Sequence, residues 1–219
     1  MDFAAARRAM VDSQVRPNDV TDVRIVAAML ELPRERFVPE PQQALAYADF
    51  DIPVTQKKPA RCLLKPMVLA KLAQAADVRE TDHVLDVGCA TGYSSALLAR
   101  LAGSVLSLEE EPGLARFAHE ALASLGEARA EVVTGPLVAG WPTAAPYDLI
   151  FVNGATEIAP RALAPQLKEG GRLAAIVGKM PATKAIIYRW IDGDLSGWPV
   201  FDAGAPLLPG FAAPPVFVF

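Results

Sequence analysis

Short apolar runs alternate with stretches of helical periodicity through the middle of the chain. The apolar runs cover residues 83–87, 104–108, 130–133, 147–152 and 172–177, and the helical patterns cover residues 93–101, 112–125 and 160–167. Strands that alternate with helices form βαβ units, whose parallel strands are covered on both faces of the sheet. The pattern therefore predicts an α/β fold with a doubly wound, mostly parallel sheet.

The N-terminal third follows a different pattern, with short helices joined by loops. The expected helices run from about residue 3 to 11, from a cap at Asn18 or Thr21 to residue 30, and from Pro66 to residue 76. The longest irregular stretch covers residues 49–61. We therefore expect residues 1–78 to form an N-terminal helical subdomain with a covering loop.

The C-terminal third predicts further strands. Residues 185–191 and 216–219 are apolar and β-branched or aromatic, and they flank a turn signal at residues 192–194. We expect them to add an antiparallel edge to the sheet. Residues 79–219 would then form one α/β domain.

Composition and charge narrow the class of protein. The 219 residues are 52% hydrophobic and 21% charged, which is an ordinary globular mixture. The net charge of −4 gives no basic surplus for the phosphates of a nucleic acid, so we expect no nucleic-acid partner. The N-terminus lacks the apolar core of a signal peptide, and no stretch has the length of a membrane span. We therefore expect a cytoplasmic protein with no membrane partner; its oligomeric state is left open.

Cysteines and histidines are too few for a disulfide framework or a metal site. The chain has Cys62, Cys89, His83 and His119 and no others of either type. A zinc site usually binds through four such ligands in closely spaced pairs, and these four are scattered along the chain without that spacing. No metal site is therefore expected.

A glycine turn follows the first strand of the α/β part. Residues 86–93 read Asp-Val-Gly-Cys-Ala-Thr-Gly-Tyr and open a helix, whose first N–H groups can bind an anion. Glu109 ends the next strand, where a carboxylate accepts hydrogen bonds from a ribose in nucleotide-binding α/β folds. Asn153 follows the fourth strand at the same edge. The turn therefore predicts a nucleotide-like ligand.

Two ligands suit such a turn. A dinucleotide prefers G-x-G-x-x-G, but positions 88, 90 and 93 are Gly, Ala and Tyr. S-adenosylmethionine has an amino acid end instead, whose ammonium suits Asp86 and whose carboxylate suits the helix N-terminus. The order acid-x-Gly-x-x-x-Gly therefore favours S-adenosylmethionine.

Several motifs are similar to those of the protein-L-isoaspartate O-methyltransferase family. Residues 32–39, Leu-Pro-Arg-Glu-Arg-Phe-Val-Pro, match its V-P-R-E-x-F-V-P stretch, and residues 46–49 match its A-Y-x-D. Residues 86–93 resemble its cofactor loop, E-I-G-T-G-S-G-Y. Residues 160–173 match its I-P-x-x-L-x-x-Q-L-x-x-G-G-R-L. The chain therefore resembles this family from residue 10 to about residue 177.

The resemblance implies a Rossmann-like class I methyltransferase with S-adenosylmethionine as cofactor. Its reaction would methylate the free α-carboxylate of an isoaspartyl residue in a damaged protein or peptide. The residues expected to bind the cofactor are Asp86, Gly88, Cys89, Ala90, Gly92, Tyr93, Glu109, Glu110 and Asn153, and those expected to bind the substrate are Lys57, Lys58, Arg61 and Lys65. A carboxylate is ionised at neutral pH, so the reaction needs no strong general base.

Three departures from the family pattern leave other functions open. Leu64 occupies the position of the family's substrate-contacting serine, the catalytic position in the stretch T-I-S-Q-P. Pro136 stands in Gly135-Pro136-Leu137 where the family has G-D-G, whose aspartate reaches the adenine. Ala90 replaces the middle glycine of the turn. The alternatives are a methyltransferase of the same fold with another acceptor, and a non-catalytic relative that binds a cofactor or a protein.

Overall fold

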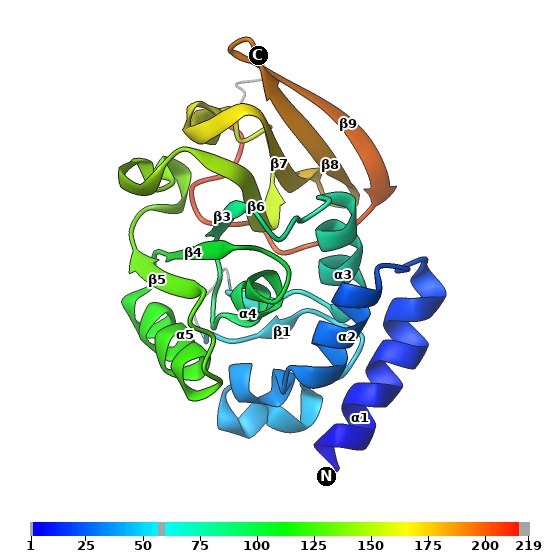
Figure 1. The fold of residues 1–219 in the computed structure, drawn as a ribbon. Helices are drawn as coiled ribbons and strands as arrows, with labels where there is room; N and C mark the ends of the chain where they lie inside the picture. The colour runs from blue at the N-terminus through cyan, green and yellow to red at the C-terminus, as the bar shows by residue number, and fades with distance from the viewer. Residues whose placement is uncertain (1, 57–59, 215–219) are drawn as a thin grey trace.

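A seven-stranded sheet organises the chain, as the computed structural model shows for residues 2–56 and 60–214 (Figure 1). Its strands lie in the order β5-β4-β3-β6-β7-β8-β9, of which β3 to β7 are parallel and β8 and β9 antiparallel. The strands are β3 (His83–Val87), β4 (Ser104–Glu109), β5 (Ala130–Thr134), β6 (Tyr147–Thr156), β7 (Leu167–Lys179), β8 (Ala182–Ile191) and β9 (Asp194–Asp202). The predicted α/β fold with a mostly parallel sheet and an antiparallel edge is confirmed.

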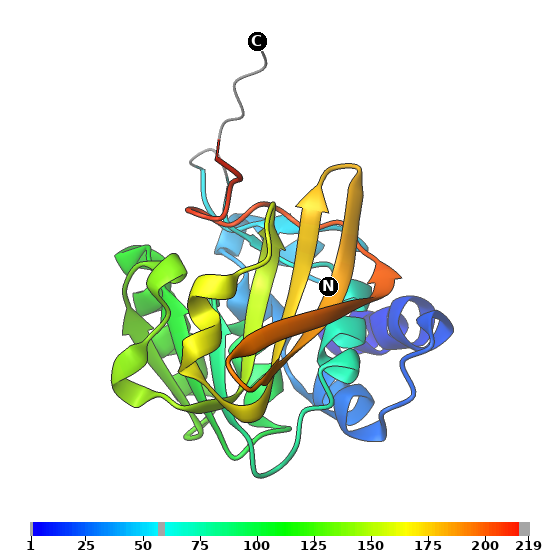
Figure 2. The same cartoon turned by 90° about the horizontal axis from the view of Figure 1, so that it is seen from above.

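The five α-helices of the described residues all lie on one side of this sheet (Figures 1 and 2). They are α1 (Phe3–Met10), α2 (Val23–Glu31), α3 (Pro66–Ala75), α4 (Tyr93–Ala99) and α5 (Pro112–Ser124). Of these, α3, α4 and α5 contact its strands, and α1 and α2 pack against other helices. Side chains from all five helices share one core with alternate strand residues such as Val84 and Leu149. The remaining strand residues, such as Leu85 and Ile150, face a second core on the opposite side. None of the helices in the described ranges is long and apolar enough to cross a membrane.

The second face is covered by short 3-10 turns and by the C-terminal segment. The turns are Leu137–Ala139, Pro142–Ala144 and Arg161–Gln166. The sequence predicts an α-helix over residues 160–167, but the structure has a 3-10 helix there, at Arg161–Gln166. Pro165 lies inside the turn, where it has no N–H to donate and its ring hinders a continuous α-helix.

Two other details differ from the sequence prediction. Asp22 caps α2 by accepting from the Arg24 backbone N–H at 2.8 Å, whereas the Asn18 side chain donates back to Gln14 O. The antiparallel edge is completed by β9, which the sequence did not predict as a strand. The predicted strand at residues 216–219 lies outside the described residues.

A small hairpin in the N-terminal third reaches the edge of the sheet where the parallel strands end. Its strands, β1 (Ile52–Pro53) and β2 (Cys62–Leu63), pair antiparallel. The Val54 N–H donates to Arg61 O at 2.8 Å, and the Arg61 N–H donates to Thr55 Oγ1 at 2.9 Å. These bonds fix the backbone of Arg61, and its side chain extends to Glu109 at the end of β4.

The strand order creates a topological switch point at the carboxyl ends of β3 and β6, and we refer to this edge of the sheet as the crevice. The chain leaves β3 toward β4 on one side, and β6 lies on the other side. Open α/β sheets bind their ligands at such a switch point. The glycine turn after β3, Glu109 at the end of β4 and Asn153 in β6 all lie at this edge.

Candidate active site

The glycine turn has a backbone that most residues avoid. Gly88, Ala90 and Gly92 have φ angles of +81°, +52° and +95°. Gly88 and Cys89 donate their N–H groups to the backbone oxygen of Leu108 at 2.8 and 3.2 Å. An alanine at positive φ is unusual, and the Ala90 N–H donates to Glu109 Oε2 at 2.8 Å, which helps to hold it there. The turn is therefore tied to the end of β4.

Glu109 is the centre of this arrangement. Its buried carboxylate accepts from the N–H groups of Ala90, Glu110 and Glu111 at 2.8, 3.0 and 3.2 Å. It also forms an ion pair with Arg61, whose Nη2 lies 2.8 Å from Oε2. Both carboxylate oxygens thus have strong donors. The ion pair was not predicted; the sequence assigned Arg61 to the substrate and Glu109 to the cofactor.

Asp86 and Asn153 form a second polar cluster beside the turn. Asp86 Oδ2 accepts from Ser94 Oγ at 2.7 Å and from Ser95 Oγ at 2.8 Å. Asn153 Nδ2 donates to Ser94 Oγ at 3.0 Å and to Gly88 O at 3.2 Å. The Oδ1 atoms of Asp86 and Asn153 are buried and have no hydrogen-bond partner within the described part of the chain. The cluster thus holds two free acceptors, and sequence reasoning missed the two serines that orient it.

The environment of Asp86 favours its neutral form. Burial raises the pKa of its carboxyl from 3.8 to about 6, while the hydrogen bonds from Ser94 and Ser95 act in the opposite direction. The nearby charge of Glu109 raises this pKa further, and that of Arg61 lowers it. Because a pKa of about 6 still lies below 7, the carboxyl is mostly ionised at neutral pH, and a cationic group would stabilise this buried charge.

Leu208 fills the space between the ends of β3 and β6. A Cβ atom at Gly154 would lie 2.6 Å from Leu208 Cγ, and one at Gly88 would lie 3.1 Å from Leu208 Cδ2 and 3.0 Å from Arg61 Nη2. The segment that carries Leu208 runs beside β6. The Ala155 N–H donates to Pro206 O at 2.8 Å, and the Leu208 N–H donates to Ala155 O at 2.9 Å. Nothing in the sequence signalled this leucine, because it lies in a proline-rich tail without a motif.

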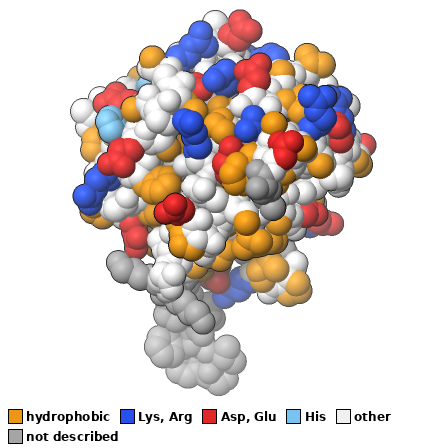
Figure 3. Space-filling view, turned by 90° about the horizontal axis from the view of Figure 1, so that it is seen from below, with side chains coloured by type: hydrophobic (Ala, Val, Ile, Leu, Met, Phe, Trp, Pro, Cys, Tyr) orange, Lys and Arg blue, Asp and Glu red, His pale blue; other side chains and the backbone are white. Residues whose placement is uncertain are grey.

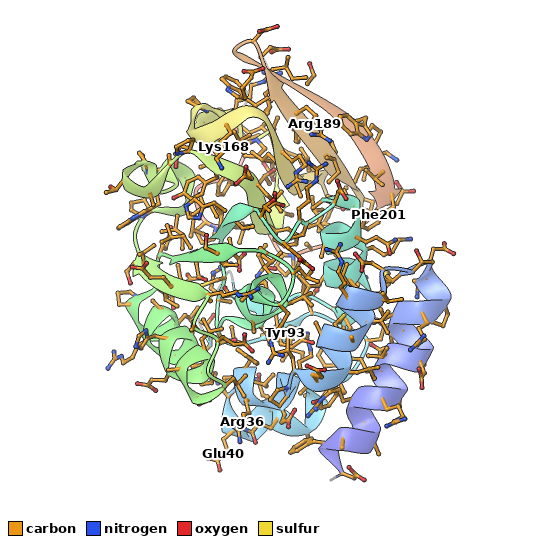
Figure 4. The ribbon with its side chains drawn as sticks, viewed as in Figure 1. Arg36, Glu40, Tyr93, Lys168, Arg189 and Phe201 are labelled. Atoms are coloured by element: carbon orange, nitrogen blue, oxygen red, sulfur yellow. The ribbon has the colours of Figure 1, made fainter. Side chains whose placement is uncertain are left out.

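Of the other residues expected to bind the cofactor, two are buried and one is exposed. Cys89 is buried, and burial raises the pKa of its thiol well above 9.0. The buried Tyr93 ring packs edge-on against Phe37 and beneath the guanidinium of Arg34 (Figure 4). Glu110 is exposed, and only its backbone N–H contacts Glu109.

The positions expected at the substrate are only partly described. Lys57 and Lys58 lie outside the described residues. Lys65 is half-buried at the start of α3 and donates its N–H to Asp51 Oδ1 at 2.9 Å. Leu64, at the position of the family serine, is 2% exposed and belongs to the core, where its backbone oxygen accepts from Arg34.

Pro136 lies at the surface, at the position expected for an adenine-binding aspartate. It is exposed, and neighbouring Gly135 packs against the ring of Trp141, 3.0 Å from the site of a Cβ. The described residues contain no group of three or more His, Cys, Asp or Glu side chains that could hold a metal ion. The polar groups at the crevice therefore do not include the expected aspartate, since Pro136 occupies its position.

A sheet of this strand order, with a glycine turn after β3 and a carboxylate at the end of β4, matches the fold of the class I methyltransferases. A family described as Protein-L-isoaspartate(D-aspartate) O-methyltransferase (PCMT) matches residues 5–193. The chain therefore belongs to this family.

Curated relatives and solved structures agree with this assignment. A protein-L-isoaspartate O-methyltransferase of Methanoculleus marisnigri is 40% identical over 172 residues, which are 78% of this chain and 77% of the relative. One of Geotalea uraniireducens is 34% identical over 185 residues, covering 84% and 83%. A solved protein-L-isoaspartate O-methyltransferase shares the fold with a TM-score of 0.82 at 24% identity, over 93% of this chain and 66% of the longer solved chain.

A second solved structure bears on the cofactor of the family. It is described as a putative protein-L-isoaspartate O-methyltransferase from Plasmodium falciparum in complex with S-adenosyl-L-homocysteine. It aligns with a TM-score of 0.76 at 17% identity, over 95% of this chain and 98% of the solved one. The predicted family, enzyme class and family cofactor are confirmed.

The polar groups of this chain fit S-adenosylmethionine, while the space beside them is filled. The free Oδ1 atoms of Asp86 and Asn153 suit an ammonium, which has several N–H donors. Glu109 stands where a ribose would be bound. However, Arg61 already pairs with Glu109, and Leu208 lies over Gly88. These two side chains thus take up hydrogen-bonding capacity and space beside the glycine turn.

Proposed function

We propose that this chain is an S-adenosylmethionine-dependent carboxyl methyltransferase that acts on isoaspartyl residues of damaged proteins or peptides. The observation that carries the proposal is the buried Glu109 carboxylate beside the glycine turn, with the free acceptors of Asp86 and Asn153 close by. The family membership supports the same reaction. The two cysteines are free thiols, which is compatible with the predicted cytoplasmic location.

In this mechanism Glu109 would bind the ribose, and Asp86 with Asn153 would bind the ammonium of the cofactor. S-adenosylmethionine supplies an electrophilic methyl group when bound. The described residues of the chain would mainly position the acceptor, since an α-carboxylate is already ionised at pH 7. We propose that residues 1–78 cover the substrate, with Arg61 and Lys65 supplying positive charge, and that residues 79–219 bind the cofactor.

A methanol-release assay tests this function. The chain is incubated with S-adenosylmethionine and an isoaspartyl peptide, and the matching aspartyl peptide serves as substrate control. We expect methyl ester only on the isoaspartyl peptide, and a much lower rate for Glu109→Gln, which removes the charge but keeps the shape. Absence of ester from the wild-type chain, with cofactor bound, would refute the isoaspartyl substrate.

One observation favours a second candidate, a methyltransferase with a different acceptor. Leu64 is buried in the core at the position where the family has a serine, so its side chain offers no hydrogen bond to a carboxylate substrate. The same assay with free small acids and with intact proteins separates the two functions. Transfer to one of these acceptors without transfer to the isoaspartyl peptide would support this second function.

A further inference from the structure

Arg61 and Leu208 lie far apart in the sequence, and both contact the glycine turn at Gly88. Arg61 comes from the β1–β2 hairpin and Leu208 from the segment after β9. A Cβ atom at Gly88 would lie 3.0 Å from Arg61 Nη2 and 3.1 Å from Leu208 Cδ2. Arg61 is 4% exposed and Leu208 is 2% exposed, so both side chains are buried beside the glycine turn.

The ion pair of Arg61 competes directly with a ribose. A ribose diol donates its hydroxyl hydrogens to the oxygens of a carboxylate. In Glu109 these oxygens already accept from Arg61 at 2.8 Å and 3.5 Å, besides three backbone N–H groups. A buried guanidinium is a stronger donor to a carboxylate than a neutral hydroxyl. The crevice is therefore held closed by an interaction that the ligand must replace.

Leu208 competes for space rather than for hydrogen bonds. Its side chain lies against Gly154 and Gly88, the two positions at this edge where a missing Cβ lets another group approach the backbone. Glycines at such positions normally admit a ligand. In this chain they admit a leucine of its own C-terminal segment, which backbone hydrogen bonds to Ala155 hold beside β6.

We propose that Arg61 and Leu208 form a gate that closes the cofactor crevice of the free protein. This inference rests on the proposed function, because the gate residues occupy the site that we assign to S-adenosylmethionine. Cofactor binding would then require Arg61 to leave Glu109 and Leu208 to leave the glycine turn. The measured affinity for the cofactor then equals the affinity of the open form multiplied by the fraction of molecules in which the gate is open.

The gate predicts that weakening either residue strengthens cofactor binding. If the gate is open in about one molecule in ten, the full loss of closure raises the affinity about tenfold. Arg61→Met keeps an unbranched side chain and removes the guanidinium with its charge. Leu208→Ala shortens the second gate residue and keeps Arg61 in place. Arg189→Met is a control with the same change of net charge, since Arg189 lies on β8 far from Tyr93 and the glycine turn (Figure 4).

Calorimetry with S-adenosyl-L-homocysteine measures this effect without any turnover. We expect Arg61→Met and Leu208→Ala each to bind the ligand several-fold to about tenfold more tightly than the wild-type chain, with Arg189→Met unchanged. Circular dichroism verifies that each variant is folded. If Arg61→Met is unfolded, the affinity of Leu208→Ala alone decides whether the gate exists. Equal or weaker binding by the folded variants, with measurable binding by the wild-type chain, would overturn the gate and leave the proposed function intact. No binding by any folded variant, at millimolar ligand, would overturn the proposed function and the gate together.

Discussion

The side chain of Leu208 lies so close to Gly154 that a Cβ atom there would come within 2.6 Å of Leu208 Cγ and 2.7 Å of Cδ2. Gly154 lies near the end of β6 and has no positive φ angle, so contacts rather than backbone strain exclude a larger residue. Leu208 makes the closest of these contacts, and the backbone oxygen of Pro206 lies 3.2 Å from the same Cβ position. Gly154→Ala should destabilise the protein by about 1–3 kcal/mol through overpacking. Urea unfolding measures the loss.

The double variant identifies Leu208 as the cause. Leu208→Ala removes the atoms that the new methyl group would meet, so Gly154→Ala should cost at least about 1 kcal/mol less in that background. Additive effects of the two substitutions would contradict the contact.

Asp86 predicts a specific pH dependence of stability. Its folded pKa of about 6 lies above the ordinary value of 3.8, mainly because of burial. Well below pH 3.8 the carboxyl is neutral in both folded and unfolded chains and makes stability neither rise nor fall with pH. Between pH 4 and pH 6 the folded state binds more protons, so the free energy of unfolding falls as the pH rises, by about 3 kcal/mol in total.

Asp86→Asn should remove this loss. The difference in unfolding free energy between the variant and the wild-type chain should shift in favour of the variant as the pH rises from 4.5 to 7.5, by roughly 2 kcal/mol or more. Urea unfolding at the two pH values measures it, with the exposed Asp194→Asn as control. A difference that does not change with pH would show that Asp86 is not a destabilising buried charge.

Arg172 holds a second buried charge far from the crevice, in a hollow at the opposite edge of the sheet. On the face of the molecule seen from below, lysine, arginine and acidic side chains lie at the surface in contact with solvent (Figure 3). Arg172 is buried instead. Arg172 pairs with the buried Asp82 and donates to Asp77 O at 2.6 Å. Arg172→Met leaves the Asp82 carboxylate without its partner and should cost about 3–5 kcal/mol of stability.

A compensating substitution tests the origin of that cost. Asp82→Asn in the Arg172→Met background removes the unpaired charge, so part of the stability should return. If thermal and urea unfolding show a loss below about 1 kcal/mol for Arg172→Met, the pair is not a major support of the fold.

Leu64→Ser tests whether the family serine can be restored. Because Leu64 is 2% exposed in the core, the substitution should destabilise the chain by about 2–5 kcal/mol, as Leu64→Ala would. We expect no gain in methyl ester formation on an isoaspartyl peptide, since the side chain at this position packs inward. A higher rate for the folded Leu64→Ser variant would show instead that the position contacts substrate.

The sheet could be predicted largely from sequence because buried parallel strands read as continuous apolar runs. β3 has the predicted bounds, and β4 and β5 differ from them by one residue. β9 was missed because its side chains are mostly exposed and it contains Gly197 and Pro199, which are uncommon within strands.

The sequence predicted the glycine turn and Glu109, but it did not predict that Arg61 and Leu208 contact them. The glycine turn and Glu109 carry local signals, and the fold brings them together through the Ala90 N–H. The pairing of Arg61 with Glu109 joins residues 48 positions apart through a hairpin that no short pattern predicts. Leu208 likewise reaches the crevice only through its bonds to β6.

A crystal structure of the wild-type chain grown with saturating S-adenosyl-L-homocysteine tests the central claim most directly. The account predicts the ribose hydroxyls on the carboxylate of Glu109, with the Arg61 guanidinium and the Leu208 side chain both displaced from Gly88. A structure in which the ligand binds elsewhere, or in which Arg61 still pairs with Glu109 and Leu208 still covers the turn, would contradict it.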